Sequence, residues 1–318
     1  VTGMAGKWRQ MGETPRDWGF DEYTTDQTAG GWYWQRTHLN NGEEVTVPDG
    51  TYGPDFIQSF AVDFIKRYKN KPFFFYYPMH LVHGPIRRTP DTAKGTQGAE
   101  RLYADNIAYM DKQVGALVAE LEKFGLREKT LVIFTGDNGT ALNFPSEIGG
   151  RMINGKKGSM LEGGSRVPFI ASWPGTTPSG KVSKDILSFA DPHATFAELA
   201  GVKQPESMKF DGRSFAPQLL GKTGHPREWA YVQLGPRWFV REPSFKMNEQ
   251  GELFDMSDAP FVEKLITKDA DTESSNAARV GLTAALAELN PAAGKADQGA
   301  GNPKKAGQRA KKKAKAAA

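Results

Sequence analysis

Three segments of the sequence combine polar side chains in patterns that could act on an anion. The first is residues 135–139, in which Asp137 and Asn138 stand side by side after a short apolar run. A carboxylate and an amide oxygen are hard ligands that suit Ca²⁺ or Mg²⁺. An Asp-Asn-Gly sequence is also typical of a simple turn. The pair is therefore a candidate metal site, with a turn as the alternative.

The second segment contains His80 and His83, which follow an aromatic run at residues 73–77. Two imidazoles at this spacing could be zinc ligands, but the sequence places neither a third histidine nor a cysteine nearby. The other interpretations are one catalytic and one structural imidazole, or two surface histidines. The sequence alone favours the structural interpretation slightly.

The third segment, residues 155–168, is rich in glycine and carries Lys156, Lys157 and Arg166. Glycine lets a backbone approach an anion closely, and the lysines supply charge for a phosphate or a sulfate. The spacing differs from that of a Walker A loop, Gly-x4-Gly-Lys-Ser/Thr. A solvated glycine-rich loop is the alternative.

All three segments lie at the ends of predicted buried strands, where open α/β sheets place their ligand sites. Apolar runs predict the strands, and apolar residues at three- and four-residue spacing predict the helices. Because helices alternate with strands, the sequence predicts an α/β fold with a mainly parallel sheet flanked by helices. Residues 1–55 are expected to be loop and turn around short ordered pieces. The predicted strands are 73–77, 131–134 and 167–171, and the predicted helices are 55–68, 102–124 and 192–200.

The pattern changes after residue 220, where short strand candidates are separated by turn residues. They predict a small antiparallel sheet, followed by a helix at residues 277–289. We therefore expect a catalytic core at 1–220, a sheet-plus-helix subdomain at 221–292 and a disordered basic tail at 293–318. The strand candidates are 229–234, 238–241, 245–247 and 252–254.

Composition excludes several classes of protein. The formal net charge is +4, but seven of the Lys and Arg residues lie within 304–315, and without them the net charge is −3. The basic character is therefore a property of the tail, and we expect no nucleic-acid partner. No apolar run approaches the ~18 residues of a membrane helix, so no membrane span is expected. The chain contains no cysteine, which excludes disulfides and thiolate metal sites.

Taken together, the segments resemble the sulfatases of the alkaline phosphatase superfamily, in the order and at the spacing of that family. The resemblance covers roughly residues 1–260 and implies an alkaline phosphatase-like fold that is truncated at its N-terminus. The motifs that carry it are Gly6-Lys7-Trp8, residues 18–23, His83-Gly84-Pro85, residues 135–139, residues 157–168, Trp173-Pro174-Gly175 and residues 251–255.

The resemblance implies a sulfuric ester hydrolase and assigns a role to each matching residue. Asp137 and Asn138 would be two ligands of one Ca²⁺ ion, whose ligand set is incomplete in this chain. Lys7, His83 and Lys157 would surround the sulfate group, with His83 as the proton donor to the leaving oxygen. Fixed cations and a divalent metal would stabilise the charge that develops on the sulfate oxygens.

The chain departs from the family pattern in two places. Arg9 stands where the family usually has a histidine, and a guanidinium can hold the sulfate but cannot act as a base. The family's nucleophile is a formylglycine made from Cys or Ser in a Cys/Ser-x-Pro-x-Arg motif, which this chain lacks. We therefore expect the formylglycine and the paired aspartates of the metal site upstream of Val1, and we expect this fragment alone to be inactive.

Two alternatives to a sulfatase remain open from sequence. One is a phosphatase or phosphodiesterase of the same superfamily, and the other is a non-catalytic anion-binding homologue. The partner expected for the sulfatase is a small-molecule or glycan sulfate ester, and the location expected from the resemblance is periplasmic or secreted. Trp32, Tyr33 and Trp34 could stack on a sugar or aryl ring or could pack structurally. The sequence identifies neither the particular ester nor the oligomeric state.

Overall fold

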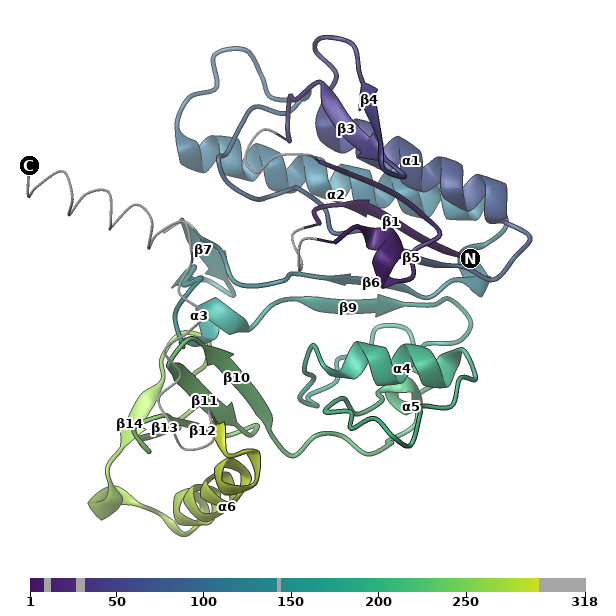
Figure 1. The fold of residues 1–318 in the computed structure, drawn as a ribbon. Coiled ribbons are helices and arrows are strands. Elements are labelled where there is room, and N and C mark those ends of the chain that lie inside the picture. The colour runs from purple at the N-terminus through teal and green to yellow at the C-terminus, as the bar shows by residue number, and fades with distance from the viewer. Residues whose placement is uncertain (9–12, 27–31, 142–143, 292–318) are drawn as a thin grey trace, which may run out of the picture. The chain divides into compact units, whose positions relative to one another are not determined.

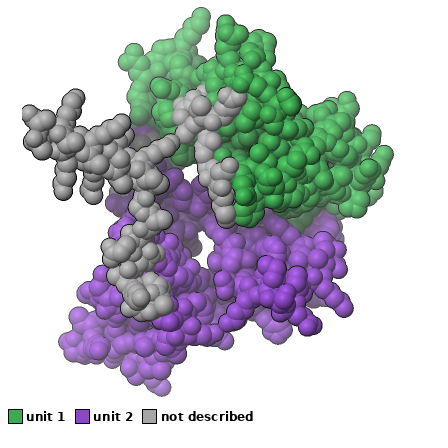
Figure 2. All heavy atoms as spheres, in the orientation of Figure 1, with its two compact units in different colours: residues 1–132 green, residues 133–318 purple. Residues whose placement is uncertain are grey.

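The computed structural model describes residues 1–8, 13–26, 32–141 and 144–291. Arg9 and the predicted basic tail at 293–318 lie outside the described residues. The chain divides into two compact units, Val1–Val132 and Ile133–Ala318, which are coloured separately in Figure 2. The boundary expected at residue 220 stays a prediction.

The first unit is built on a mixed five-stranded sheet with the strand order β4-β3-β2-β1-β5 (Figure 1). β1 pairs in parallel with β2 and β5, whereas β2, β3 and β4 pair in antiparallel fashion. The parallel centre of the sheet brings the carboxyl ends of β1 and β5 to the same edge. The strands are β1 (Thr2–Gly6), β2 (Glu22–Asp26), β3 (Thr37–Asn40), β4 (Glu43–Thr46) and β5 (Phe74–Tyr76).

Two helices pack on the first unit's sheet. α1 (Gly53–Tyr68) contacts β1 and β2, and α2 (Ala99–Lys123) packs on α1 (Figure 1). Their apolar faces meet in a core that includes Phe64, Ile65 and Leu121. Both helices predicted from the apolar spacing, at 55–68 and 102–124, are therefore confirmed to within a few residues at each end.

Two expectations for the first unit need correction. The described part of residues 1–55 contains four strands. The missed β2 is buried through Tyr23, two threonines and an aspartate, so that no apolar periodicity marks it. The strand predicted at 73–77 is present but is not buried on both faces. Phe73 and Phe75 pack against the Phe64 ring of α1, whereas Phe74 and Tyr76 point to the other face and are 41% and 43% exposed.

The second unit contains a strand pair and a hairpin that lie next to the candidate site. β6 (Val132–Thr135) pairs with β9 (Phe169–Ser172), close to the predicted positions. β7 (Pro145–Ile148) and β8 (Arg151–Asn154) form an antiparallel hairpin that the sequence analysis missed. Gly149 and Gly150 have φ values of 58° and 78°. Two central residues with positive φ are typical of a type I′ hairpin turn.

A five-stranded antiparallel sheet with one helix forms the C-terminal part of the second unit (Figure 1). Val240, Met247 and Leu253 of the sheet are buried against Leu282 and Ala285 of the helix. The sequence predicted four of these strands and missed the last. The elements are β10 (Ala230–Leu234), β11 (Arg237–Arg241), β12 (Phe245–Asn248), β13 (Leu253–Asp255), β14 (Lys264–Ile266) and α6 (Glu273–Leu289).

The remaining helices of the second unit are short. α3 (Glu162–Ser165) lies inside the glycine-rich segment, and α4 (Asp191–Leu199) confirms the helix predicted at 192–200. α5 (Ala216–Leu219) packs beside α4. Three 3-10 turns complete the described elements: Pro15–Trp18, Arg127–Lys129 and Lys268–Ala270.

Candidate functional site

Lys7 lies at the carboxyl edge of the first unit's sheet, directly after β1. Its backbone N–H donates a 2.9 Å hydrogen bond to the carbonyl of Pro78, in the segment that follows β5. Gly6 has a φ of 124°, and a Cβ there would lie 2.2 Å from the same carbonyl oxygen. Only glycine permits this approach. The half-buried Lys7 is thereby fixed beside the segment that carries the histidines.

His83 lies on that segment with an exposed side chain and a well-fixed backbone. Its N–H donates to the His80 carbonyl at 2.8 Å, and its own carbonyl accepts from the Tyr33 hydroxyl at 2.6 Å. Burial raises the pKa of Tyr33, which keeps this hydroxyl protonated. The Nδ1 atom of His83 lies 2.6 Å from the Gly84 carbonyl, which can only accept. Nδ1 therefore carries a hydrogen, and Nε2 is the ring atom left for proton transfer.

Three residues before His83, His80 forms a buried pair with Asp26. His80 Nε2 lies 2.9 Å from Asp26 Oδ1, and both side chains are almost fully buried. The Trp32 ring stacks on His80 at 5.4 Å and meets the edge of His83 at 5.1 Å. The pair gives His80 a structural role, because it holds the segment on which His83 stands.

His38 faces the same buried pair from β3, where it is the cross-strand neighbour of Asp26. It is fully buried, and neither of its ring nitrogens has a hydrogen-bond partner among the described residues. Burial, with a further contribution from the charge of His80, lowers the pKa of His38 to about 4. His38 is therefore neutral at pH 7.

Asp137 and Asn138 follow β6 in the second unit. Asp137 is exposed and Asn138 is half-buried. The Asn138 amide nitrogen donates to the Gly139 carbonyl at 2.9 Å, which leaves the amide oxygen as the atom that could bind a cation.

The loop that carries Lys157 packs directly against the loop that carries this pair. Lys157 N–H donates to the Thr140 carbonyl at 3.1 Å, and Gly139 N–H donates to the Gly164 carbonyl at 3.0 Å. A Cβ on Gly139 would lie 1.8 Å from the Gly163 carbonyl oxygen, so the backbones touch. The second unit thus brings the segments of Asp137, Asn138 and Lys157 together, although 20 positions separate Asp137 from Lys157 in the sequence.

A pocket of about 210 Å³ lies between these two loops and the β7–β8 hairpin. Asn138 contributes to it, and Arg166 adds a cationic side chain to which the sequence assigned no role. Its position three residues after Glu162-Gly163 in the recognised motif was the available signal. The lining residues are Asn138, Gly139, Thr140, Ser146, Ile153, Gly155, Gly163, Arg166, Val167 and Pro168.

The donor set fits part of a calcium site. Asp137 and Asn138 supply hard oxygen atoms of the type that Ca²⁺ prefers, but at most three of the six to eight that it takes. Among the described residues, no group of three or more His, Asp or Glu side chains could hold a metal ion. The remaining ligands of a Ca²⁺ ion would come from groups other than Asp137 and Asn138.

The candidate residues thus fall into two groups. Lys7 and His83 lie in the first unit, and Asp137, Asn138 and Lys157 lie in the second. The convergence of the two groups on one pocket stays a prediction.

Trp32, Tyr33 and Trp34 were expected either to stack on a ligand ring or to pack structurally, and they differ in burial. Trp32 and Tyr33 are buried and pack structurally, whereas Trp34 is 43% exposed. The Trp34 indole N–H donates to the Arg88 carbonyl at 3.1 Å, and its ring lies 4.8 Å from Tyr52. Trp34 is the member that could still contact a ligand ring.

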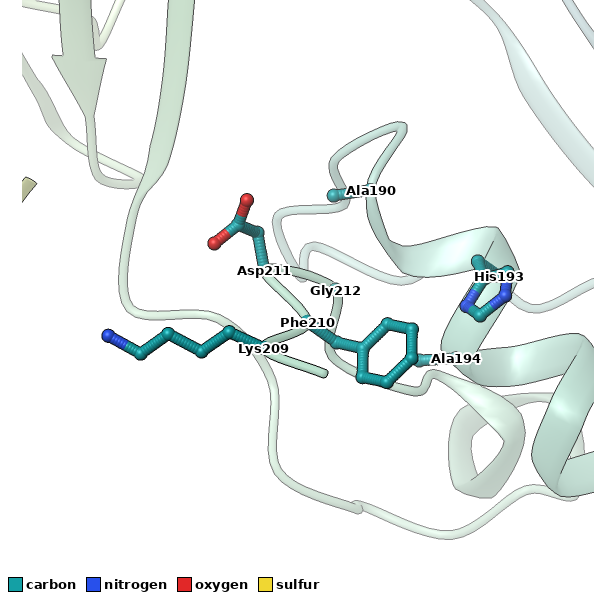
Figure 3. Close-up of a pocket in the computed structure, with 7 residues that line it drawn as sticks. All are labelled: Ala190, His193, Ala194, Lys209, Phe210, Asp211 and Gly212. Carbon is teal, nitrogen blue, oxygen red and sulfur yellow. The ribbon is translucent and has the colours of Figure 1, made fainter. Parts of the chain in front are cut away.

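A second pocket, of about 260 Å³, lies beside α4 (Figure 3). His193 and Phe210 line it with their rings stacked on each other at 5.1 Å, whereas Lys209 and Asp211 point away. Its two charged side chains therefore do not point toward the His193 ring.

None of the described helices has the length and apolar character needed to cross a membrane.

Comparison with known proteins identifies the class of the chain. The Sulfatase family model matches residues 1–202, and the chain belongs to this family. The alkaline phosphatase-like fold predicted from the sequence is confirmed by sulfatase structures that superpose on the chain.

Three similar proteins illustrate the relationship. The N-acetylgalactosamine-6-sulfatase of Canis lupus familiaris is 37% identical over 166 residues, which cover 51% of this chain and 31% of the relative. Arylsulfatase D of Homo sapiens is 35% identical over 212 residues, covering 60% and 35%. A crystal structure of Ps i-CgsB in complex with k-i-k-neocarrahexaose is 27% identical with a TM-score of 0.75, covering 93% of this chain and 72% of that one. The chain spans about a third of the length of the curated relatives it matches.

Proposed function

We propose that this chain contributes most of the active site of a sulfatase that hydrolyses sulfate monoesters. The observation that carries the proposal is the backbone contact between the Asp137-Asn138 loop and the Lys157 loop, within a chain of the sulfatase family. This contact supports the proposal because a loop with two hard oxygen donors lies against a cationic loop, as the binding of a sulfate next to a metal ion requires.

Each residue has a distinct task in this proposal. Lys7 and Lys157 hold the sulfate oxygens and stabilise the negative charge that grows on them in the transition state. His83 gives a proton from Nε2 to the oxygen of the leaving alcohol, while its Nδ1–H stays on the Gly84 carbonyl. Arg9, which cannot shuttle a proton, holds the sulfate.

The proposal also needs a metal ion and a nucleophile. Asp137 and Asn138 would hold one Ca²⁺, which supplies positive charge beside the sulfate when it is bound. The 318 residues contain neither a cysteine nor a Ser-x-Pro-x-Arg sequence, so we propose a formylglycine nucleophile from outside them.

The substrate we propose is a small-molecule or glycan sulfate ester. The names of the relatives support this class, because one is an N-acetylgalactosamine-6-sulfatase, another is an arylsulfatase, and Ps i-CgsB has been solved with a neocarrahexaose. The exposed Trp34 offers an aromatic face that could stack on a sugar or an aryl ring. We propose a periplasmic or secreted location, as in exported members of the family.

A comparison of two esters tests the reaction. The product of the complete reading frame that contains this chain is assayed with 4-nitrophenyl sulfate and 4-nitrophenyl phosphate in the presence of Ca²⁺. We expect hydrolysis of the sulfate to dominate, and we expect the 318-residue chain alone to show none. Faster hydrolysis of the phosphate would favour a phosphatase, and binding of sulfate without turnover by the complete product would favour an anion-binding homologue.

A further inference from the structure

A buried carboxylate lies at the end of the loop that carries Lys157. Glu162 begins α3 and is 3% exposed. One of its oxygens lies 3.0 Å from Arg241 Nε of β11, and the other lies 3.5 Å from Arg166. Its backbone N–H donates at 2.8 Å to the carboxylate of Glu263, just before β14. The loop is thus tied to the C-terminal sheet at both the backbone and the side chain.

A buried lysine on the same sheet completes this connection. Lys246 of β12 is 2% exposed, and its ammonium group donates to the Met160 carbonyl at 2.9 Å and pairs with Glu263. The ammonium group lies 4.9 Å from the ring centre of Phe239. One side chain of the sheet therefore binds the loop directly and also fixes the carboxylate that binds it.

A third contact reaches the residue next to Lys157. Arg237, at the start of β11, donates to the Gly158 carbonyl at 2.9 Å. The loop between β8 and α3 has no helix or strand of its own. Its position therefore depends on such contacts. Arg237 and Lys246 of the C-terminal sheet hold its carbonyls at 158 and 160, and Glu263, next to β14, holds the N–H of residue 162 at its end.

The burial of these charges favours a positioning role over a purely stabilising one. Taking an ammonium and a carboxylate out of water offsets most of their attraction, so that apolar side chains of similar volume often stabilise a protein as well. A fixed network of ion pairs and charge-assisted hydrogen bonds does, however, define one geometry for the groups it binds. A catalytic charge needs such definition, because a displacement of ~1 Å can lower turnover about 100-fold.

We propose that the C-terminal antiparallel sheet sets the position of Lys157, with Lys246, Glu263 and Arg241 as positioning residues that act through the 155–162 loop. The proposal rests on the function proposed above for Lys157. It gives the C-terminal sheet a part in the sulfate site through side chains that do not contact the substrate.

Hydrogen exchange on the intact chain tests the structural half of the proposal. In Lys246→Met, amides of residues 155–165 should exchange at least about tenfold faster, while those of α1 keep their rates. Arg151→Met is the matched control, because it removes an exposed pair with Asp258 in the same unit. Unchanged exchange in the loop, or equal changes in both variants, would overturn the proposal.

A double variant distinguishes a local change in the loop from a general loss of folding. Lys246→Met leaves Glu263 as an unpaired buried charge, whereas Lys246→Met with Glu263→Gln leaves neither charge. The double variant should fold and still show faster exchange at 155–165, because the Met160 carbonyl has lost its donor. A folded double variant with the parent's exchange pattern would contradict the positioning role.

A double-mutant cycle on turnover tests the functional half. If Lys246 acts through Lys157, Lys246→Met lowers kcat/KM of the complete product about 10- to 100-fold in the parent, but less than about twofold when Lys157→Ala is already present. Independent losses that multiply would refute the coupling. No effect of Lys157→Ala by itself would instead refute the function proposed for Lys157, whereas the exchange result would still report on the contact between sheet and loop.

Discussion

Replacing Gly139 with alanine should separate the two loops of the second unit that carry Asp137-Asn138 and Lys157. A Cβ at this position would lie 1.8 Å from the Gly163 carbonyl oxygen, about half of an ordinary contact distance of ~3.5 Å. The neighbour is backbone and cannot rotate away. The two loops must therefore move apart by about 1.5 Å or bend elsewhere.

The structure sets the size of the effect. Moving the loops apart breaks or stretches the bonds from Gly139 to Gly164 and from Lys157 to Thr140. Each backbone hydrogen bond contributes about 0.5–1.5 kcal/mol, so we expect the free energy of unfolding to fall by about 1–3 kcal/mol. Because Lys157 moves relative to Asp137 and Asn138, kcat/KM for an aryl sulfate should fall about 100-fold.

Urea unfolding of the 318-residue chain and turnover by the complete product measure the two effects. Gly115→Ala is the control, because Gly115 lies within α2 with nothing within 4 Å of an added Cβ. That variant should gain about 0.5–1 kcal/mol and keep its activity. If Gly139→Ala behaved like Gly115→Ala, the close contact between the loops would be wrong.

Two further predictions concern stability. The pKa of His38 is about 4 in the folded chain, below the ordinary value near 6.5 of the unfolded chain, so protons bind the unfolded state more tightly. Its contribution to stability is therefore complete above pH 6.5 and is lost as the pH falls toward 4. Urea unfolding should show a loss of about 1–2 kcal/mol between pH 7.5 and pH 5, and His38→Phe should flatten this part of the profile. Asp191→Ala removes the carboxylate that accepts from Arg227 at 2.7 Å and leaves that buried guanidinium unpaired. Thermal or urea denaturation should show a loss of about 3–5 kcal/mol, and a loss below 1 kcal/mol would contradict the role of this pair.

The sequence predicted the elements whose apolar residues follow a regular period. α1 was placed to within two residues, because its buried side chains recur at helical spacing. β2 escaped notice because its buried positions include Thr24, Thr25 and Asp26, which no hydrophobicity pattern marks. The β7–β8 hairpin did have a local signal, because Gly149-Gly150 is a pair typical of a tight hairpin turn.

Some residues of the candidate site could likewise be predicted from the sequence, and others could not. Asp137, Asn138 and Lys157 could be named from the sequence because their residue types suit the chemistry proposed for them. Lys246 could not, since a lysine in a short strand usually faces solvent, and its burial depends on Glu263 and on the Met160 carbonyl, 86 residues away. Contacts of this range depend on the fold and leave no local trace in the sequence.

The most direct test of the account is the turnover of an aryl sulfate by Lys157→Ala in the complete product, with Lys222→Ala as the control. Lys222 is an exposed lysine of the same unit that has no part in the proposed site. Removal of one preorganised charge at the sulfate should lower kcat by about 10²–10³-fold in Lys157→Ala, whereas Lys222→Ala should match the parent. Equal rates for the two variants would contradict the claim that the Lys157 loop and the Asp137-Asn138 loop together form a sulfate site.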